Sequence, residues 1–119
     1  MRAWLSTRMP LHDERGAASV LAVALVAATL LATGILAPLC AAYAARQTAA
    51  GAADAAALAA ADTASGLVPG IPCQAAGRAA ELNGASLVDC DVTGLIALVQ
   101  VSTTVVGMSI TASARAGPP

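Results

Sequence analysis

Residues 16–45 read GAASVLAVALVAATLLATGILAPLCAAYAA, an uninterrupted stretch without charge between Arg15 and Arg46. This stretch decides the fold, because a helix of about 20 apolar residues already crosses the ~30 Å hydrocarbon core of a bilayer. We therefore predict a transmembrane helix over 16–45. Its excess length must tilt the helix or carry one end out of the lipid.

The arginine positions predict the direction of this helix. Arg2, Arg8 and Arg15 precede the apolar stretch, whereas only Arg46 closely follows it. Short flanking segments rich in basic residues stay on the cytoplasmic side. The sequence therefore predicts a cytoplasmic basic leader over 1–15, a single pass through the cell membrane and an extracytoplasmic C-terminal domain.

Two other interpretations of the apolar stretch predict a different localisation of the protein. Ala42-Tyr43-Ala44 matches the small-x-small pattern of a signal-peptidase site, which would release a small soluble secreted domain near Ala44. The stretch is longer than the apolar region of about 7–15 residues in a signal peptide, which favours a retained anchor. Cys40 would carry the lipid of a lipoprotein, but Leu39 is too large for the preceding position. A small apolar role inside the helix is favoured for Cys40.

The composition limits the size of the core and the range of partners. The 119 residues are 58% hydrophobic but only 2% aromatic, and alanine supplies nearly half of the hydrophobic count. Since alanine buries little area, the extracytoplasmic part has a small core. The net charge of -1 offers no basic surface, so nucleic acid is not an expected partner.

The helical pattern continues after the span into an alanine-rich extension over 46–64. Alanine has the highest helix propensity, so we predict one helix of about 45 residues. Small side chains let a second helix approach closely, whereas a plain solvated helix would be expected to carry more charge. We predict a helix-packing surface at Gly51, Ala53, Asp54, Ala57 and Leu58.

A small α+β domain is predicted over 73–117, after a Pro- and Gly-rich loop at 65–72. A short helix over 73–82 ends at Asn83-Gly84. Segments that alternate apolar and polar residues, or are rich in β-branched residues, predict three strands at 86–92, 95–105 and 108–115. We expect a three-stranded antiparallel meander with the short helix on its apolar face.

Cysteine and acidic residues occupy opposite faces of the first predicted strand. Val88, Cys90 and Val92 are expected on the apolar face, with Asp89 and Asp91 opposite. A carboxylate pair can bind a cation or transfer protons, but beside a turn it is more often a solvated face. We favour the solvated face.

Cys73 and Cys90 are predicted to form a disulfide. Cys73 opens the short helix and Cys90 lies on the strand face that this helix would cover, in an oxidising compartment. A metal or redox pair is the alternative. Two cysteines without a nearby histidine make a poor zinc site, and their spacing is not CxxC.

Sequence motifs for catalysis are absent. His12 is the only histidine and falls in the predicted cytoplasmic leader, where it cannot serve an external site. We find no phosphate loop, nucleophile motif or metal cluster. We therefore expect a non-enzymatic protein without cofactor, metal or catalytic residues.

Asp13-Glu14-Arg15-Gly16-Ala17 before an apolar span resembles the start of the TadE- and TadG-like proteins of the tight adherence (Flp-type) pilus system. The helix after Arg46-Gln47 and the tail with Cys73, Asn83-Gly84 and Cys90 resemble a short actinobacterial branch, the helicase/secretion-neighbourhood TadE-like proteins. These features cover most of residues 13–117.

The resemblance implies a pilin-like or pseudopilin-like envelope protein of a pilus or a type II/IV-like secretion apparatus. Its partners would be other pilin-like or Tad membrane proteins, together with copies of the same chain. Pilin-like precursors are cut after a glycine that ends a basic leader, which here would be between Gly16 and Ala17. Many of those proteins have Glu five residues after the cut, whereas this chain has Leu21.

Overall fold

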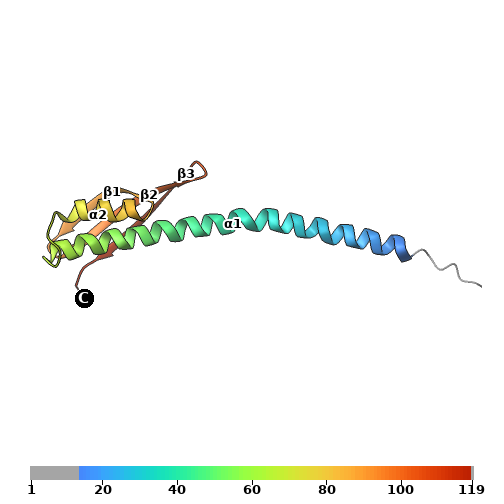
Figure 1. Ribbon diagram of the computed structural model, residues 1–119, viewed down its shortest axis with the longest axis horizontal. Coiled ribbons are helices and arrows are strands. Elements are labelled where there is room, and N and C mark those ends of the chain that lie inside the picture. The colour runs from blue at the N-terminus through green and yellow to red at the C-terminus, as the bar shows by residue number, and fades with distance from the viewer. Residues whose placement is uncertain (1–13, 119) are drawn as a thin grey trace, which may run out of the picture. The chain divides into compact units, whose positions relative to one another are not determined.

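A computed structural model describes residues 14–118, with side chains from residue 16 onward, and it confirms the predicted α+β fold (Figure 1). Contacts divide the chain into two compact units, Met1–Leu39 and Cys40–Pro119. The described part contains two helices and three strands. They are α1 (Glu14–Ala64), α2 (Pro72–Leu82), β1 (Ser86–Thr93), β2 (Ile96–Val105) and β3 (Met108–Ala116).

Helix α1 covers 51 residues, somewhat more than the sequence predicted, and it contains Pro38. The first two residues of α1, Glu14 and Arg15, belong to the predicted leader. Helix α2 begins at Pro72, one residue before the predicted start, because proline suits the first turn of a helix. The predicted loop therefore ends one residue earlier than expected.

The three strands form an antiparallel meander in the order β1-β2-β3. Thr93 pairs with Ile96 and Val105 pairs with Met108, so a two-residue turn closes each hairpin. The first turn contains Gly94, whose φ of 62° is a conformation that suits glycine. Val99 pairs with Cys90 on one side and Ala114 on the other, which places all three on the apolar face.

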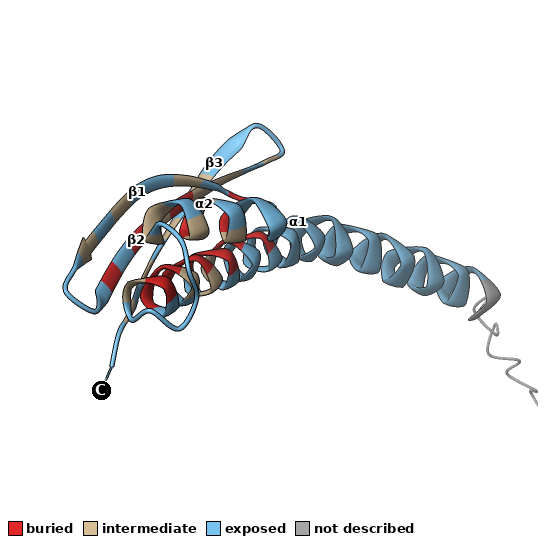
Figure 2. Ribbon diagram, turned by 60° about the vertical axis from the view of Figure 1, so that its left-hand side comes forward, coloured by how far each residue is buried: buried red, intermediate tan, exposed pale blue. Residues whose placement is uncertain are grey.

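Alanine builds most of the core of the second unit. One stripe of α1 and the inner side of α2 face the apolar surface of the sheet, where Val99 and Val101 are the largest fully buried side chains (Figure 2). Small side chains let the helices approach the sheet closely. The buried cluster consists of Ala52, Ala53, Ala56, Ala57, Ala60, Ala61, Ala76, Ala80, Ala85, Ala97, Val99 and Val101.

The predicted face of β1 is wrong at one residue. Val88 was expected beside Cys90 and Val92, but it is 58% exposed, and Leu87 packs against the core instead. The register with β2 shifts between Leu87 and Asp89, which leaves Val88 as an extra residue in the strand. Because a bulge of this kind reverses the alternation, strict period-2 reasoning misplaced the residue.

Candidate functional site: an exposed apolar helix and a disulfide-closed domain

The first feature is an apolar helix surface that the described residues of the chain leave uncovered. Every residue from 16 to 44 is exposed. Within the described residues, α1 is the one helix long and apolar enough to cross a membrane, and a signal sequence near the N-terminus would have the same properties. Monomeric soluble proteins rarely expose apolar patches larger than a few hundred Å².

The predicted leader cleavage site lies within α1. Gly16 and Ala17 are both helical and exposed, close to the start of the helix at Glu14. An alanine-rich helix that begins before the bond would have to unwind locally for a peptidase to bind it in extended form. The predicted residues are therefore solvent-accessible, and whether they are cut stays a prediction.

The second feature is the Cys73–Cys90 disulfide, which the structure confirms. Cys73 lies in the first turn of α2 and Cys90 lies in β1, with 5.9 Å between their Cα atoms. That separation is typical of a disulfide. The bond joins α2 to the edge strand that it covers, and Cys40 is the free, exposed cysteine.

The five residues of the predicted helix-packing surface separate onto two sides of α1. Ala53 and Ala57 are buried in the domain's own core, against α2 and the sheet. Gly51, Asp54 and Leu58 are exposed on the other side. Only the exposed three are available to another protein, so a partner would meet a surface that includes one carboxylate and one leucine.

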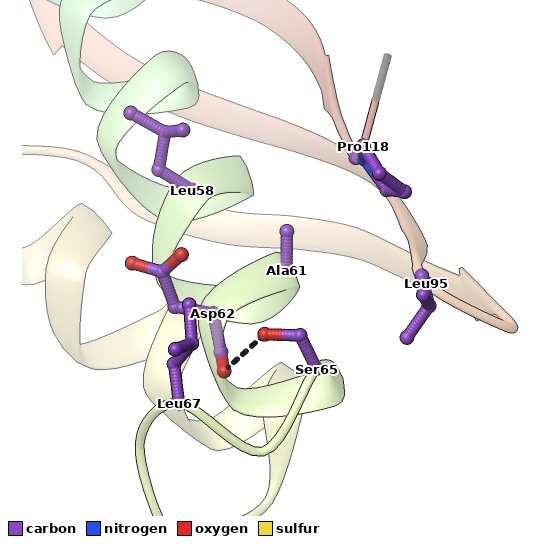
Figure 3. Close-up of a pocket in the computed structure, with 8 residues that line it drawn as sticks. Leu58, Ala61, Asp62, Ser65, Leu67, Leu95 and Pro118 are labelled. Atoms are coloured by element: carbon purple, nitrogen blue, oxygen red, sulfur yellow. Dashed lines mark hydrogen bonds between the residues drawn. The ribbon is translucent and has the colours of Figure 1, made fainter.

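A shallow groove near the end of α1 was not expected from the sequence. It has a volume of about 270 Å³ and is mostly apolar (Figure 3). The Ser65 hydroxyl on its wall donates a hydrogen bond of 2.9 Å to the Asp62 carbonyl. Its lining comes from three segments of the chain, with no local motif to reveal it: Leu58, Ala61, Asp62, Ser65, Leu67, Leu95, Gly117 and Pro118.

Acidic side chains in the domain do not converge on a reactive centre. Asp89 and Asp91 are exposed on the outer side of the sheet. Leu98 of β2 separates Asp91 of β1 from Arg115 of β3, because it is the register partner of both residues. In the part of the chain that the structure describes, no group of three or more potential metal ligands occurs. His12 lies outside that part.

Two features of the described residues therefore stand out. The apolar surface of α1 is compatible with a membrane anchor, and the disulfide-closed domain leaves one side of α1 exposed. No family model, no curated protein and no solved structure matches the chain. Its function must therefore be argued from these residues and their geometry.

Proposed function

We propose that this chain is a membrane-anchored, pilin-like or pseudopilin-like component of a tight adherence (Flp-type) pilus or a type II/IV-like secretion apparatus. It acts by assembly and not by catalysis. The sequence resemblance to TadE-like proteins supports this proposal, and so does the arrangement of an apolar helix that carries a small extracytoplasmic domain. The partners are the bilayer, other pilin-like or Tad membrane proteins, and copies of the same chain.

The exposure of the apolar residues in α1 carries the anchoring part of the proposal. Large side chains such as Leu25, Leu30 and Ile35 are more than half exposed. Transfer of apolar surface out of water stabilises a protein by about 25 cal/mol per Å². Lipid can provide this transfer along the whole stretch, because α1 satisfies its own backbone hydrogen bonds.

The proposed orientation, with the C-terminal domain outside the cytoplasm, is supported by the arginine positions and by the disulfide. Three arginines precede the span and one follows it closely, which favours a cytoplasmic leader. Disulfides persist in oxidising compartments and are rare in the cytosol. The Cys73–Cys90 bond therefore agrees with an extracytoplasmic domain.

Assembly would use the side of α1 that the domain leaves uncovered. Gly51 lets a neighbouring helix come close, Leu58 supplies apolar area, and Asp54 supplies a charge for orientation. Leu21 occupies the position where many pilins have Glu, so this chain lacks that carboxylate for docking subunits inside the membrane. The extramembrane part of α1 then contributes more to the choice of neighbour.

Membrane fractionation combined with N-terminal sequencing tests the anchor. We expect the chain in the membrane fraction after carbonate washing, with a mature start at Met1 or at Ala17. A start at Ala17 would show leader cleavage. A soluble extracytoplasmic product that begins near Ala45 would instead support the secreted domain and overturn the anchor.

Photo-crosslinking in intact cells tests assembly. A photoreactive residue at the exposed Leu58 should yield adducts with envelope proteins or with a second copy. Ala53 would be a poor position because it is buried in the domain. The control is a photoreactive residue at Leu82, which is also exposed but lies at the end of α2. Equal adduct patterns at both positions would argue against a specific surface on α1.

A further inference from the structure

The turn between β2 and β3 carries an unusual residue for its backbone conformation. Val106 has a φ of 50° and Gly107 a φ of 76°, as in the two-residue turns that normally contain Asn-Gly or Asp-Gly. A β-branched residue with positive φ is a rare outlier. Val106 is also 92% exposed, so no contact within the domain explains its presence.

The sequence around this turn has no charge. Residues 104–109 read TVVGMS, and Met108 on the far side of the turn is 63% exposed. Hairpin turns in water usually contain polar residues such as Asn, Asp, Gly and Ser. An exposed valine and methionine at such a turn indicate contact with an apolar environment.

The length of β2 can be compared with the length of α1 that lies beside the domain. Leu95, just before β2, lines the same groove as Leu58 and Ala61 near the end of α1 (Figure 3). From there β2 runs for ten residues, or roughly 33 Å at the rise of a strand. Sixteen residues of helix separate Ala61 from Ala45, which is roughly 24 Å. A strand of this length that runs along the helix extends as far as Ala45.

Burial in α1 agrees with that reach. Ala45 and Ala49 are buried although they lie outside the main alanine cluster. Figure 1 shows the β2–β3 hairpin extending beyond α2, and Figure 2 shows its turn projecting out of the domain. Val105 and Ile110, near the end of the hairpin, are half-buried. Burial along α1 therefore begins at Ala45, where its uncharged stretch ends.

We propose that the β2–β3 turn is a second membrane-contact element, in which Val106 and Met108 enter the interfacial layer of the bilayer beside α1. The inference rests on the membrane anchor proposed above. Tyr43 is 72% exposed at the same level of α1, and tyrosine is enriched at membrane interfaces. Apolar side chains at this depth leave water for the boundary between head groups and acyl chains. The contact would hold the domain at a fixed height above the lipid.

Depth-dependent tryptophan quenching in the full chain tests this inference. Trp4 is first replaced by Phe, and single tryptophans are then placed at Val106, at Leu67 and at Val26. Each protein is reconstituted in phosphatidylcholine–phosphatidylglycerol vesicles with or without brominated acyl chains. We expect a several-fold larger bromolipid quenching constant at 106 than at 67, and the reverse order with aqueous acrylamide. Leu67 is the matched control, because it is highly exposed but lies beyond the end of α1.

Three outcomes separate the inference from its premise. Quenching at 26 but not at 106 would overturn the membrane contact and leave the anchor intact. No quenching at 26 would overturn the anchor and the inference together. A tryptophan at 106 that is protected from both quenchers would show that protein covers the turn, and would also overturn the inference.

A tryptophan at Val106 replaces the residue under test, so a second tryptophan position serves as a control. With tryptophan at Met108, Val106→Asn should shift the emission to longer wavelength and reduce bromolipid quenching several-fold, although asparagine fits the backbone conformation better. Retention of the Cys73–Cys90 bond on non-reducing gels verifies the fold. Unchanged quenching in this variant would contradict a role for Val106 in the lipid contact.

Discussion

Val106 occupies a left-handed backbone conformation that costs an ordinary L-residue roughly 1–2 kcal/mol. Asparagine tolerates this conformation, so Val106→Asn should increase the free energy of unfolding of the domain by about 1 kcal/mol. Thermal or denaturant unfolding of the full chain in detergent measures the change. Val106→Thr is the control, since it is also polar but keeps the β-branch. An equal gain in both variants would show that polarity, and not backbone conformation, limits stability.

Single residues also show where sequence reasoning stops. The alternation that placed Cys90 and Val92 on the inner face of β1 was confirmed, but it failed at Val88 because the bulge there leaves no sequence signal. The position of the second turn could be predicted from Gly107. The conformation of Val106 could not, because valine normally argues against such a turn.

At the scale of elements, the disulfide is expected to contribute much of the stability of the small domain. It closes a loop with a sequence separation of 17 residues between α2 and β1. Cys73→Ser combined with Cys90→Ser should lower the free energy of unfolding by roughly 3 kcal/mol. Cys40→Ser removes the free cysteine and should leave unfolding unchanged. A similar loss in both proteins would contradict the assignment.

The alanine stripe of α1 makes the contact with the sheet sensitive to side-chain size. Ala56 is fully buried, so Ala56→Leu adds three carbon atoms where the helix and sheet already touch. Overpacking of this kind costs typically 1–3 kcal/mol. Ala44→Leu makes the same change at an exposed site of α1 and should be nearly neutral. Unfolding of both variants measures the difference, and equal stabilities would show that the interface is loosely packed.

The elements themselves were largely predictable, because each has a strong local signal. The uncharged stretch and its alanine-rich extension predicted α1, and periodicity predicted α2 and the three strands. The partner of the alanine stripe was not predictable. Small residues such as Ala53 and Ala57 suit a neighbouring helix or the domain's own sheet equally well, and here the sheet and α2 cover them.

For the whole molecule, the two units differ in the solvent that their surfaces require. The unit Cys40–Pro119 buries a cluster of alanines and valines in its own core, whereas residues 16–39 of the other unit are all exposed. The longest uncharged stretch, 16–45, indicated such a difference, although the boundary between the units falls at Cys40 and not at residue 46. The groove near Leu95 and the position of the β2–β3 turn depend on how distant segments of the chain pack together. No local sequence pattern encodes that packing.

The same substitution at two sites of α1 can show which solvent each half of the helix meets. Leu30 and Leu58 are 68% and 58% exposed on one helix, so arginine disturbs little packing within the chain at either site. An arginine at the centre of a span costs roughly 3 kcal/mol on insertion, whereas arginine on a solvated helix costs almost nothing. Leu30→Arg should therefore shift the chain from the membrane fraction to aggregates or degradation, while Leu58→Arg remains in the membrane with its disulfide formed. Should both variants fractionate alike, water and not lipid would be the solvent of the apolar stretch, because only a common solvent makes the two leucines equivalent.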